Sequence, residues 1–255
     1  MSSKRTSLIL QDFIDSRIKT NDQVRILEVG CGTGEFAHLL KAHYQDKIDL
    51  TAIDPSESSV TAAKIKTPHI NFHPQGVLDC PDATYDMIIC TKSLHHCGDL
   101  QKTVQRVYDL LAKGGILLAE ELQPDRLDSA SIIWLFDRVD LLTAAKQLNA
   151  EGLRPPHSTL ADPTIPAEQR WNAFLQKRSC HPSSAVKAAV KAVFGANTEI
   201  RENTAFMHYY LPKFRLQDTE VGRSILKEFM KQEARALGNN TIVSLGFSIV
   251  ASKSI

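Results

Sequence analysis

The sequence ILEVGCGTGEF, residues 26–36, places three glycines within five positions directly after an apolar run. Glycine allows positive φ in a tight bend, and its missing Cβ lets a ligand approach the backbone. The helix that we expect to begin near Glu35 offers free N–H groups and about half a positive charge at its N-terminus. The pattern predicts a buried strand, a tight turn and a helix, with a nucleotide-like ligand at the turn.

Short apolar runs alternate with helical patterns through the first 120 residues. Runs rich in β-branched residues predict buried parallel strands at 24–30, 48–54, 70–74, 86–91 and 115–121. Apolar residues recur at helical spacing at 35–44, 56–66 and 99–115. We expect the last of these helices to end at Gly114 and Gly115, because glycine commonly terminates helices. This rhythm predicts an α/β fold with a doubly wound, mostly parallel sheet.

The alternation stops after residue 121. Helical patterns follow at 127–149, 167–178 and 183–194, and strand, helix and strand patterns return at 198–211, 218–237 and 243–252. We therefore expect three parts. Residues 1–121 would form a Rossmann-like core with an N-terminal helix, 122–197 a helical lid inserted after the fifth strand, and 198–255 the elements that complete a seven-stranded sheet. A lid at the carboxyl edge of the strands is well placed to cover a substrate.

Composition and charge argue against several function classes. The net charge is +1 and no run of like charges occurs, so we expect neither nucleic acid nor a membrane surface as partner. No stretch reaches the roughly 18 apolar residues of a membrane span. The N-terminus lacks the pattern of a signal peptide, and the five cysteines contain no CxxC pair. These features predict a cytoplasmic protein with reduced thiols and no metal site.

The glycine spacing narrows the choice of ligand. Gly30, Gly32 and Gly34 form GxGxG, whereas dinucleotide-binding turns carry GxGxxG. Asp54 ends the second predicted strand, where a carboxylate can accept hydrogen bonds from ribose hydroxyls. Glu28 directs a second carboxylate to the same turn, which suits a cationic ligand better than a pyrophosphate.

At these residues the sequence resembles the class I S-adenosylmethionine-dependent methyltransferases, over roughly residues 24–121. ILEVGCGTG is similar to the first motif of that family and TAIDPS to its second-strand acid motif. YDMIICTKSLHHCGDL resembles the fourth-strand segment and LLAKGGILLAEE the fifth strand. Glycine-rich turns are common, but four motifs in the same order and at the family's spacing make the resemblance specific.

The resemblance implies S-adenosylmethionine as cofactor and S-adenosylhomocysteine as its product. It places Gly30, Cys31 and Gly32 along the methionine and ribose part of the cofactor. Glu28 would lie near the ammonium group, and Thr91 beside the methionine at the end of the fourth strand.

The resemblance also implies which residues hold the ribose and the adenine. Asp54 would bind the ribose hydroxyls. The residues implied near the adenine are Pro55, Ser56, Gly76, Val77 and Leu78. Many members of the family carry an acidic residue where this chain has Gly76, and Asp79 is the candidate to replace it.

The segment SLHHCGD supplies two histidines just after the fourth predicted strand. Methyl transfer requires the nucleophile to be aligned with the methyl carbon, and a base where an O, N or C nucleophile must lose a proton. His95 corresponds in position to the catalytic base of small-molecule O-methyltransferases, and His96 is the second candidate. The alternative is that both rings only pack against the cofactor.

Aromatic residues of the predicted lid and sixth strand are candidates for contact with a small-molecule substrate. They are Trp134, Trp171, His208 and Tyr209. Because neighbouring strand residues point to opposite faces, we expect either His208 or Tyr209 to face the site. The alternative is that these side chains fill the core of the lid.

These observations predict an S-adenosylmethionine-dependent methyltransferase that moves a methyl group to an O, N or C atom of a small-molecule metabolite. Two alternatives stay open. One is a non-catalytic S-adenosylmethionine-binding partner protein, since the turn and Asp54 predict binding and not turnover. The other is a nucleic-acid or protein methyltransferase. It is disfavoured because TKSL stands where amino-methylating nucleic-acid enzymes carry Asn/Asp-Pro-Pro-aromatic, and because no basic patch is present.

Overall fold

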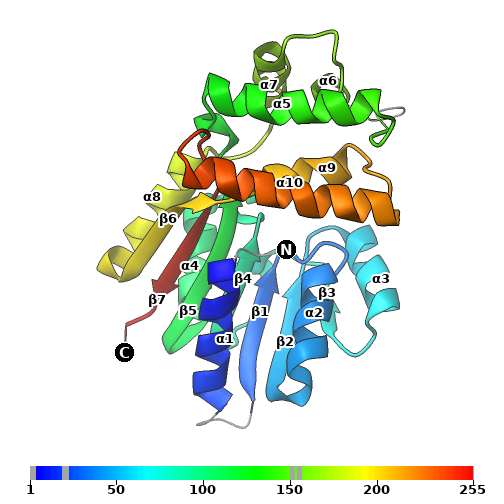
Figure 1. Ribbon diagram of the computed structural model, residues 1–255. Coiled ribbons are helices and arrows are strands. Elements are labelled where there is room, and N and C mark those ends of the chain that lie inside the picture. The colour runs from blue at the N-terminus through cyan, green and yellow to red at the C-terminus, as the bar shows by residue number, and fades with distance from the viewer. Residues whose placement is uncertain (1–3, 19–22, 150–152, 154–156, 255) are drawn as a thin grey trace. The chain divides into compact units, whose positions relative to one another are not determined.

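The computed structural model describes residues 4–18, 23–149, 153 and 157–254 (Figure 1). These residues form a mixed sheet of seven strands in the order β3-β2-β1-β4-β5-β7-β6. The strands are β1 (Val24–Val29), β2 (Ile48–Ile53), β3 (Asn71–His73), β4 (Tyr85–Thr91), β5 (Leu111–Leu122), β6 (Thr198–Thr204) and β7 (Gly246–Ser252). The pairs β1–β2, β1–β4, β2–β3 and β4–β5 are parallel. The predicted α/β class and seven-stranded, mostly parallel sheet are confirmed.

The chain divides into two compact units. The first contains residues 1–121, 181–201 and 248–255, and the second contains residues 122–180 and 202–247. The helices of the first unit are α1 (Lys4–Ile18), α2 (Glu35–Tyr44), α3 (Glu57–Lys66), α4 (Leu100–Leu110) and α8 (Ser183–Phe194). The helices of the second unit are α5 (Ser129–Ala144), α6 (His157–Leu160), α7 (Ala167–Gln176), α9 (Tyr210–Lys213) and α10 (Glu220–Gly238).

Several helices begin at polar side chains that stand directly before them in the sequence. Asp99 accepts a hydrogen bond from the Lys102 N–H at 3.0 Å at the start of α4. Asp128 accepts one from the Ser131 N–H at 2.8 Å at the start of α5. Each such cap satisfies an N–H that has no partner within the helix and contributes about 1 kcal/mol.

The core of the first unit lies along strands that are buried over nearly their whole length. Ile26 of β1 and Met87 of β4 are fully buried and belong to one apolar cluster with Ile14 of α1 and Ala37 of α2. Figure 1 shows α1 and α2 on one face of these strands, with α4 drawn behind them. Helices on both faces explain why the strands read as continuous apolar runs.

The predicted helix at 99–115 is too long. Helix α4 ends at Leu110 and β5 begins at Leu111, so Gly114 and Gly115 do not terminate the helix. Both glycines take part in strand pairing at the end of β7. The Gly114 N–H donates to the Lys253 carbonyl at 3.0 Å, and the Lys253 N–H donates to the Gly115 carbonyl at 2.9 Å.

The predicted strand at 198–211 is also too long, because β6 ends at Thr204. The following residues form a 3-10 turn, η6 (Met207–Tyr209), which continues into α9. The buried carboxylate of Glu233 accepts hydrogen bonds from the Met207 N–H at 2.6 Å and the His208 N–H at 3.3 Å. These N–H groups therefore form no hydrogen bonds to a neighbouring strand, and His208 and Tyr209 do not alternate across a strand.

The units differ from the expected division at two places. Residues 181–197, expected in the lid, belong to the first unit, where Phe194 of α8 packs edge-on against Tyr108 of α4 with ring centroids 5.1 Å apart. Residues 202–247, expected in the core, belong to the second unit, because α9 and α10 share its apolar cluster with α5 and α7. The lid role of the helical insertion stays a prediction.

No helix in the described ranges combines the length and hydropathy needed to cross a membrane.

Candidate functional site

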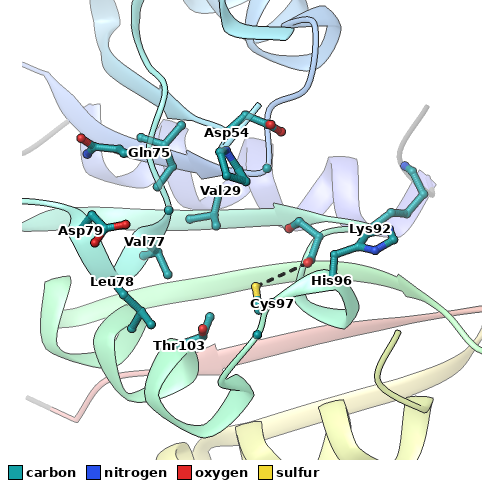
Figure 2. Close-up of a pocket in the computed structure, with 16 residues that line it drawn as sticks. Val29, Asp54, Gln75, Val77, Leu78, Asp79, Lys92, His96, Cys97 and Thr103 are labelled. Carbon is teal, nitrogen blue, oxygen red and sulfur yellow. Dashed lines mark hydrogen bonds between the residues drawn. The ribbon is translucent and has the colours of Figure 1, made fainter. Parts of the chain in front are cut away.

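A cavity of about 530 Å³ lies at the carboxyl ends of β1, β2 and β4 in the first unit (Figure 2). The strand order reverses between β1 and β4, which is the place where open α/β sheets bind ligands. The lining residues are Val29, Gly30, Ile53, Asp54, Pro55, Gln75, Gly76, Val77, Leu78, Asp79, Lys92, Ser93, His96, Cys97, Gly98 and Thr103.

The glycine-rich turn forms the wall of the cavity next to β1. Gly30, Gly32 and Gly34 all have positive φ, at 80°, 54° and 79°. The N–H groups of Gly30 and Cys31 donate to the Ile53 carbonyl at 2.8 and 3.0 Å, which ties the turn to the end of β2. A Cβ on Gly30 would lie 2.4 Å from the Cβ of Ser93. The turn therefore requires glycine at position 30 both for its φ and for its approach to the exit of β4.

Asp54 links the turn to the start of α3. One carboxylate oxygen accepts from the Gly32 N–H at 2.9 Å and the other accepts from the Ser56 N–H at 2.9 Å. Each carboxylate oxygen has two lone pairs, so both retain capacity to accept a further hydrogen bond. Because Asp54 lines the cavity, that capacity is available to the hydroxyls of a ligand.

Glu28 is a buried carboxylate in β1, with 1% of its surface exposed. Its Oε2 atom is buried and accepts no hydrogen bond. Burial, followed by the negative charge of Glu35, raises the pKa of the Glu28 carboxyl to about 8, with the charge of Lys92 acting in the opposite direction. A buried carboxylate oxygen without a hydrogen bond, beside the glycine-rich turn, suits a positively charged ligand group.

The raised pKa of Glu28 makes stability depend on pH. The ordinary value is 4.5, so between about pH 4.5 and pH 8 the folded state holds a proton that the unfolded state has lost. We expect the free energy of unfolding to fall as pH rises through this window, by up to about 1.4 kcal/mol per pH unit, and to lose no more above it. Urea denaturation at a series of pH values measures this slope.

The variant Glu28→Gln should flatten that pH dependence, because an amide does not titrate. Glu57→Gln is the matched control, since Glu57 is exposed on α3. Equal slopes for the wild type and Glu28→Gln would show that Glu28 does not hold the proton.

The two histidines occupy different positions. His96 is exposed and lines the cavity, whereas His95 is buried behind it, with ring centroids 4.1 Å apart. The Nδ1 atom of His95 hydrogen-bonds to the carboxylate of Glu121, which is fully buried at the end of β5. Glu121 also accepts from the Ser93 N–H at 3.0 Å and the Leu94 N–H at 2.7 Å. This glutamate therefore anchors the segment that carries the cavity wall after β4.

Six of the predicted cofactor residues line the cavity: Gly30, Asp54, Pro55, Gly76, Val77 and Leu78. The others lie close by in the same turns and strands but do not line it: Glu28, Cys31, Gly32, Ser56 and Thr91. Burial raises the pKa of the Cys31 thiol to about 12, which disfavours the nucleophilic thiolate. The Ser56 hydroxyl is occupied at the start of α3, where it accepts from the Ser59 N–H at 3.3 Å.

The four aromatic candidates for substrate contact all belong to the second unit. Trp171 is buried, and its Nε1–H donates to the Pro124 carbonyl at 3.0 Å. His208 hydrogen-bonds through Nδ1 to the buried Glu233 at 2.9 Å. Trp134 lies under the Arg138 guanidinium at 3.7 Å, and the Tyr209 ring lies 5.1 Å from the Lys213 ammonium. Their contact with substrate stays a prediction.

Sequence reasoning missed part of the cavity wall. The residues not assigned are Val29, Ile53, Gln75, Lys92, Ser93, Cys97, Gly98 and Thr103. Val29 and Ile53 are the last residues of β1 and β2. Their position next to the assigned Gly30 and Asp54 could have predicted that they line the cavity. Asp79, considered as the replacement for an acid at Gly76, does line the cavity. Thr103 lies on α4, and no local pattern marks it.

A family model described as a methyltransferase domain matches residues 3–168, most of the chain. The chain belongs to this methyltransferase-domain family. The resemblance to class I S-adenosylmethionine-dependent methyltransferases is thereby confirmed.

Curated relatives match about half of the chain. A malonyl-[acyl-carrier protein] O-methyltransferase from Bacillus anthracis is 31% identical over 118 residues, 45% of this chain and 44% of that protein. Thiol S-methyltransferase TMT1B from Rattus norvegicus is 26% identical over 143 residues, 52% of this chain and 56% of that protein. The chain thus spans about half the length of these relatives.

Solved structures share the fold over nearly the whole chain at low sequence identity. The plantazolicin methyltransferase BpumL, in complex with a desmethylPZN analog and SAH, gives a TM-score of 0.53 with 14% identity, covering 99% of this chain and 86% of that one. The [4+2]-cyclase SpnF gives 0.53 with 18% identity, covering 96% and 81%. At these identities the likeness concerns the fold.

Proposed function

We propose that this protein is an S-adenosylmethionine-dependent methyltransferase that acts on a small-molecule acceptor. The observation that carries the proposal is the cavity at the strand-order reversal, with Asp54 on its wall. Behind the same turn lies the Oε2 atom of Glu28, which is buried without a hydrogen bond. Membership of the methyltransferase-domain family supports the reaction class. The names of the curated relatives support an acceptor that is small or carried as an acyl group.

The residues at the cavity fit the chemical groups of S-adenosylmethionine. Asp54 can accept hydrogen bonds from the two ribose hydroxyls, and Glu28 matches the ammonium of the amino-acid end. Val77 and Leu78 provide an apolar surface for the adenine, and Asp79 beside them can accept from its amino group. The volume of about 530 Å³ lies within the range of about 300–1,000 Å³ usual for small-molecule sites.

When bound, S-adenosylmethionine supplies a methyl group on a positively charged sulfur that is a good leaving group. The task of the chain is to hold the acceptor atom in line with that methyl group, which in well-oriented systems lowers the barrier by about 7–11 kcal/mol. Glu121 hydrogen-bonds to residues 93, 94 and 95 and so anchors the adjacent cavity wall.

The proposal includes a histidine as general base, with His95 the first candidate. A hydrogen bond from Nδ1–H of His95 to Glu121 leaves Nε2 as the proton acceptor, as in carboxylate–histidine pairs that act as bases. His96 is the other candidate, since it lies on the cavity wall. Methyl-transfer assays of His95→Gln and His96→Gln separate them, because loss of the base lowers the rate by about 10²–10⁴-fold for acceptors that must lose a proton.

Isothermal titration with S-adenosylmethionine and S-adenosylhomocysteine tests the proposed cofactor. We expect Asp54→Ala to weaken both ligands by about 10-fold or more, equivalent to about 1.4 kcal/mol, because the ribose loses its acceptor. Glu57→Ala, which removes an exposed carboxylate three positions later, is expected to leave binding unchanged. Absence of binding to the wild type would overturn the proposed function.

A binder without methyl-transfer activity is the second candidate. We keep this candidate because the [4+2]-cyclase SpnF, which shares the fold, is named for a reaction other than methyl transfer. Release of S-adenosylhomocysteine in the presence of a panel of thiols, carboxylates, phenols and amines separates the two. Cofactor binding with no release for any acceptor class would favour the binder.

A further inference from the structure

We propose that Lys92 binds the carboxylate of the amino-acid end of S-adenosylmethionine, so that Lys92 and Glu28 together recognise that end as a zwitterion. The inference rests on the proposed cofactor and extends it to a specificity-determining residue. No motif quoted from the sequence assigns a role to this lysine.

Lys92 lies directly after β4 and lines the cavity. Figure 2 places it and His96 at one end of the cavity, with Val77, Leu78 and Asp79 at the other. If the apolar end receives the adenine, an extended ligand directs its amino-acid end toward Lys92. Asp54, between the two ends in the same view, then faces the ribose.

The charges along the cavity support this orientation. Among the described lining residues, Lys92 is the only lysine or arginine, and Asp54 and Asp79 are the two carboxylates. Glu28 lies close enough to Lys92 for the lysine charge to oppose the rise of its pKa. The ammonium of a ligand favours the ionised form of the Glu28 carboxyl. A ligand end with one ammonium and one carboxylate then finds one group of each opposite sign.

The backbone holds Lys92 in a conformation that favours glycine or asparagine. Its φ is +56°, in the left-handed region, which costs a residue with a Cβ about 1 kcal/mol. The Lys92 N–H donates to the Glu120 carbonyl at 2.7 Å, and Glu121 fixes the next two N–H groups. The left-handed backbone of Lys92 fixes the position of its Cβ on the cavity wall. Residues held in such a conformation are typical of ligand sites.

Titration with a matched pair of ligands tests the inference. S-adenosylmethionine and its decarboxylated form share every group except the carboxylate. We expect the wild type to bind the complete cofactor about 10-fold more tightly than the decarboxylated form. Lys92→Met should remove that preference by weakening only the complete cofactor, and Lys92→Arg should keep most of it. Lys113→Met, at an exposed lysine of β5, is the control.

The outcomes separate this inference from the proposed function. Equal weakening of both ligands by Lys92→Met would show that Lys92 supports the fold of the wall and does not read the carboxylate. Unchanged affinity for both ligands would also overturn the inference while leaving the cofactor assignment intact. A wild type that binds neither ligand would overturn both. Thermal unfolding of each variant, measured alongside, shows whether Lys92→Met retains the fold.

Discussion

Gly30→Ala is expected to lower the free energy of unfolding by about 2–5 kcal/mol. A residue with a Cβ in the left-handed region costs about 1–2 kcal/mol, and Gly30 has φ +80°. The new Cβ would also lie 2.4 Å from the Cβ of Ser93, and overpacking of this kind costs about 1–3 kcal/mol. Urea denaturation with comparison of midpoint and slope measures the loss.

Gly32→Ala is the matched control, because its φ of +54° is also left-handed but a Cβ there meets nothing within 4 Å. We expect it to lose only the conformational contribution of about 1–2 kcal/mol. Equal losses for the two variants would show that the approach of Gly30 to Ser93 is not limiting. Because Ser93 belongs to the cavity wall, Gly30→Ala should also weaken S-adenosylmethionine binding under conditions in which the variant is folded.

Glu121→Ala is expected to destabilise the protein by about 3–5 kcal/mol. The carboxylate is fully buried and accepts from the Ser93 N–H, the Leu94 N–H and His95 Nδ1. Alanine leaves these groups without that partner, and each buried donor without a hydrogen bond costs about 1–3 kcal/mol. For a chain of this size the melting temperature should fall by about 6–20 °C, measured by calorimetry.

The Glu121→Gln variant distinguishes loss of hydrogen bonds from loss of charge. Its amide oxygen can still accept from the backbone, so we expect a smaller loss of stability than for alanine. Hydrogen exchange should be faster for the Ser93 and Leu94 amides in Glu121→Ala, while the amides within helix α2 report global stability only. Wild-type stability in Glu121→Ala would contradict the anchoring role of this glutamate.

Local sequence patterns predicted the elements of the first unit closely because each carries its own signal. The apolar run before Gly30 became β1, and the helical pattern at 35–44 became α2 with the same bounds. The pattern at 183–194 likewise became α8. These stretches satisfy their backbone hydrogen bonds within the element or with strands that are buried in the same way, so periodicity is informative.

Predictions failed where a distant residue supplied the hydrogen-bond partner. Gly114 and Gly115 hydrogen-bond to Lys253, so the two glycines that were expected to end a helix lie within β5 instead. Glu233 captures the Met207 and His208 N–H groups, so a strand pattern became a 3-10 turn. Neither partner can be inferred from the local pattern, because both lie far along the chain.

For the site, the sequence by itself determined the glycine-rich turn, because positive φ and the absence of a Cβ restrict positions such as Gly30 to glycine. It also determined the place of Asp54 on the cavity wall, because this residue directly follows the end of β2. Only the tertiary structure decided that Glu121 anchors His95 and that His96 is the histidine on the cavity wall. It also placed Lys92 on the same wall. The reason is physical: a glycine's backbone requirement is local, whereas a buried carboxylate takes its role from whichever donors the packing of other strands brings within reach.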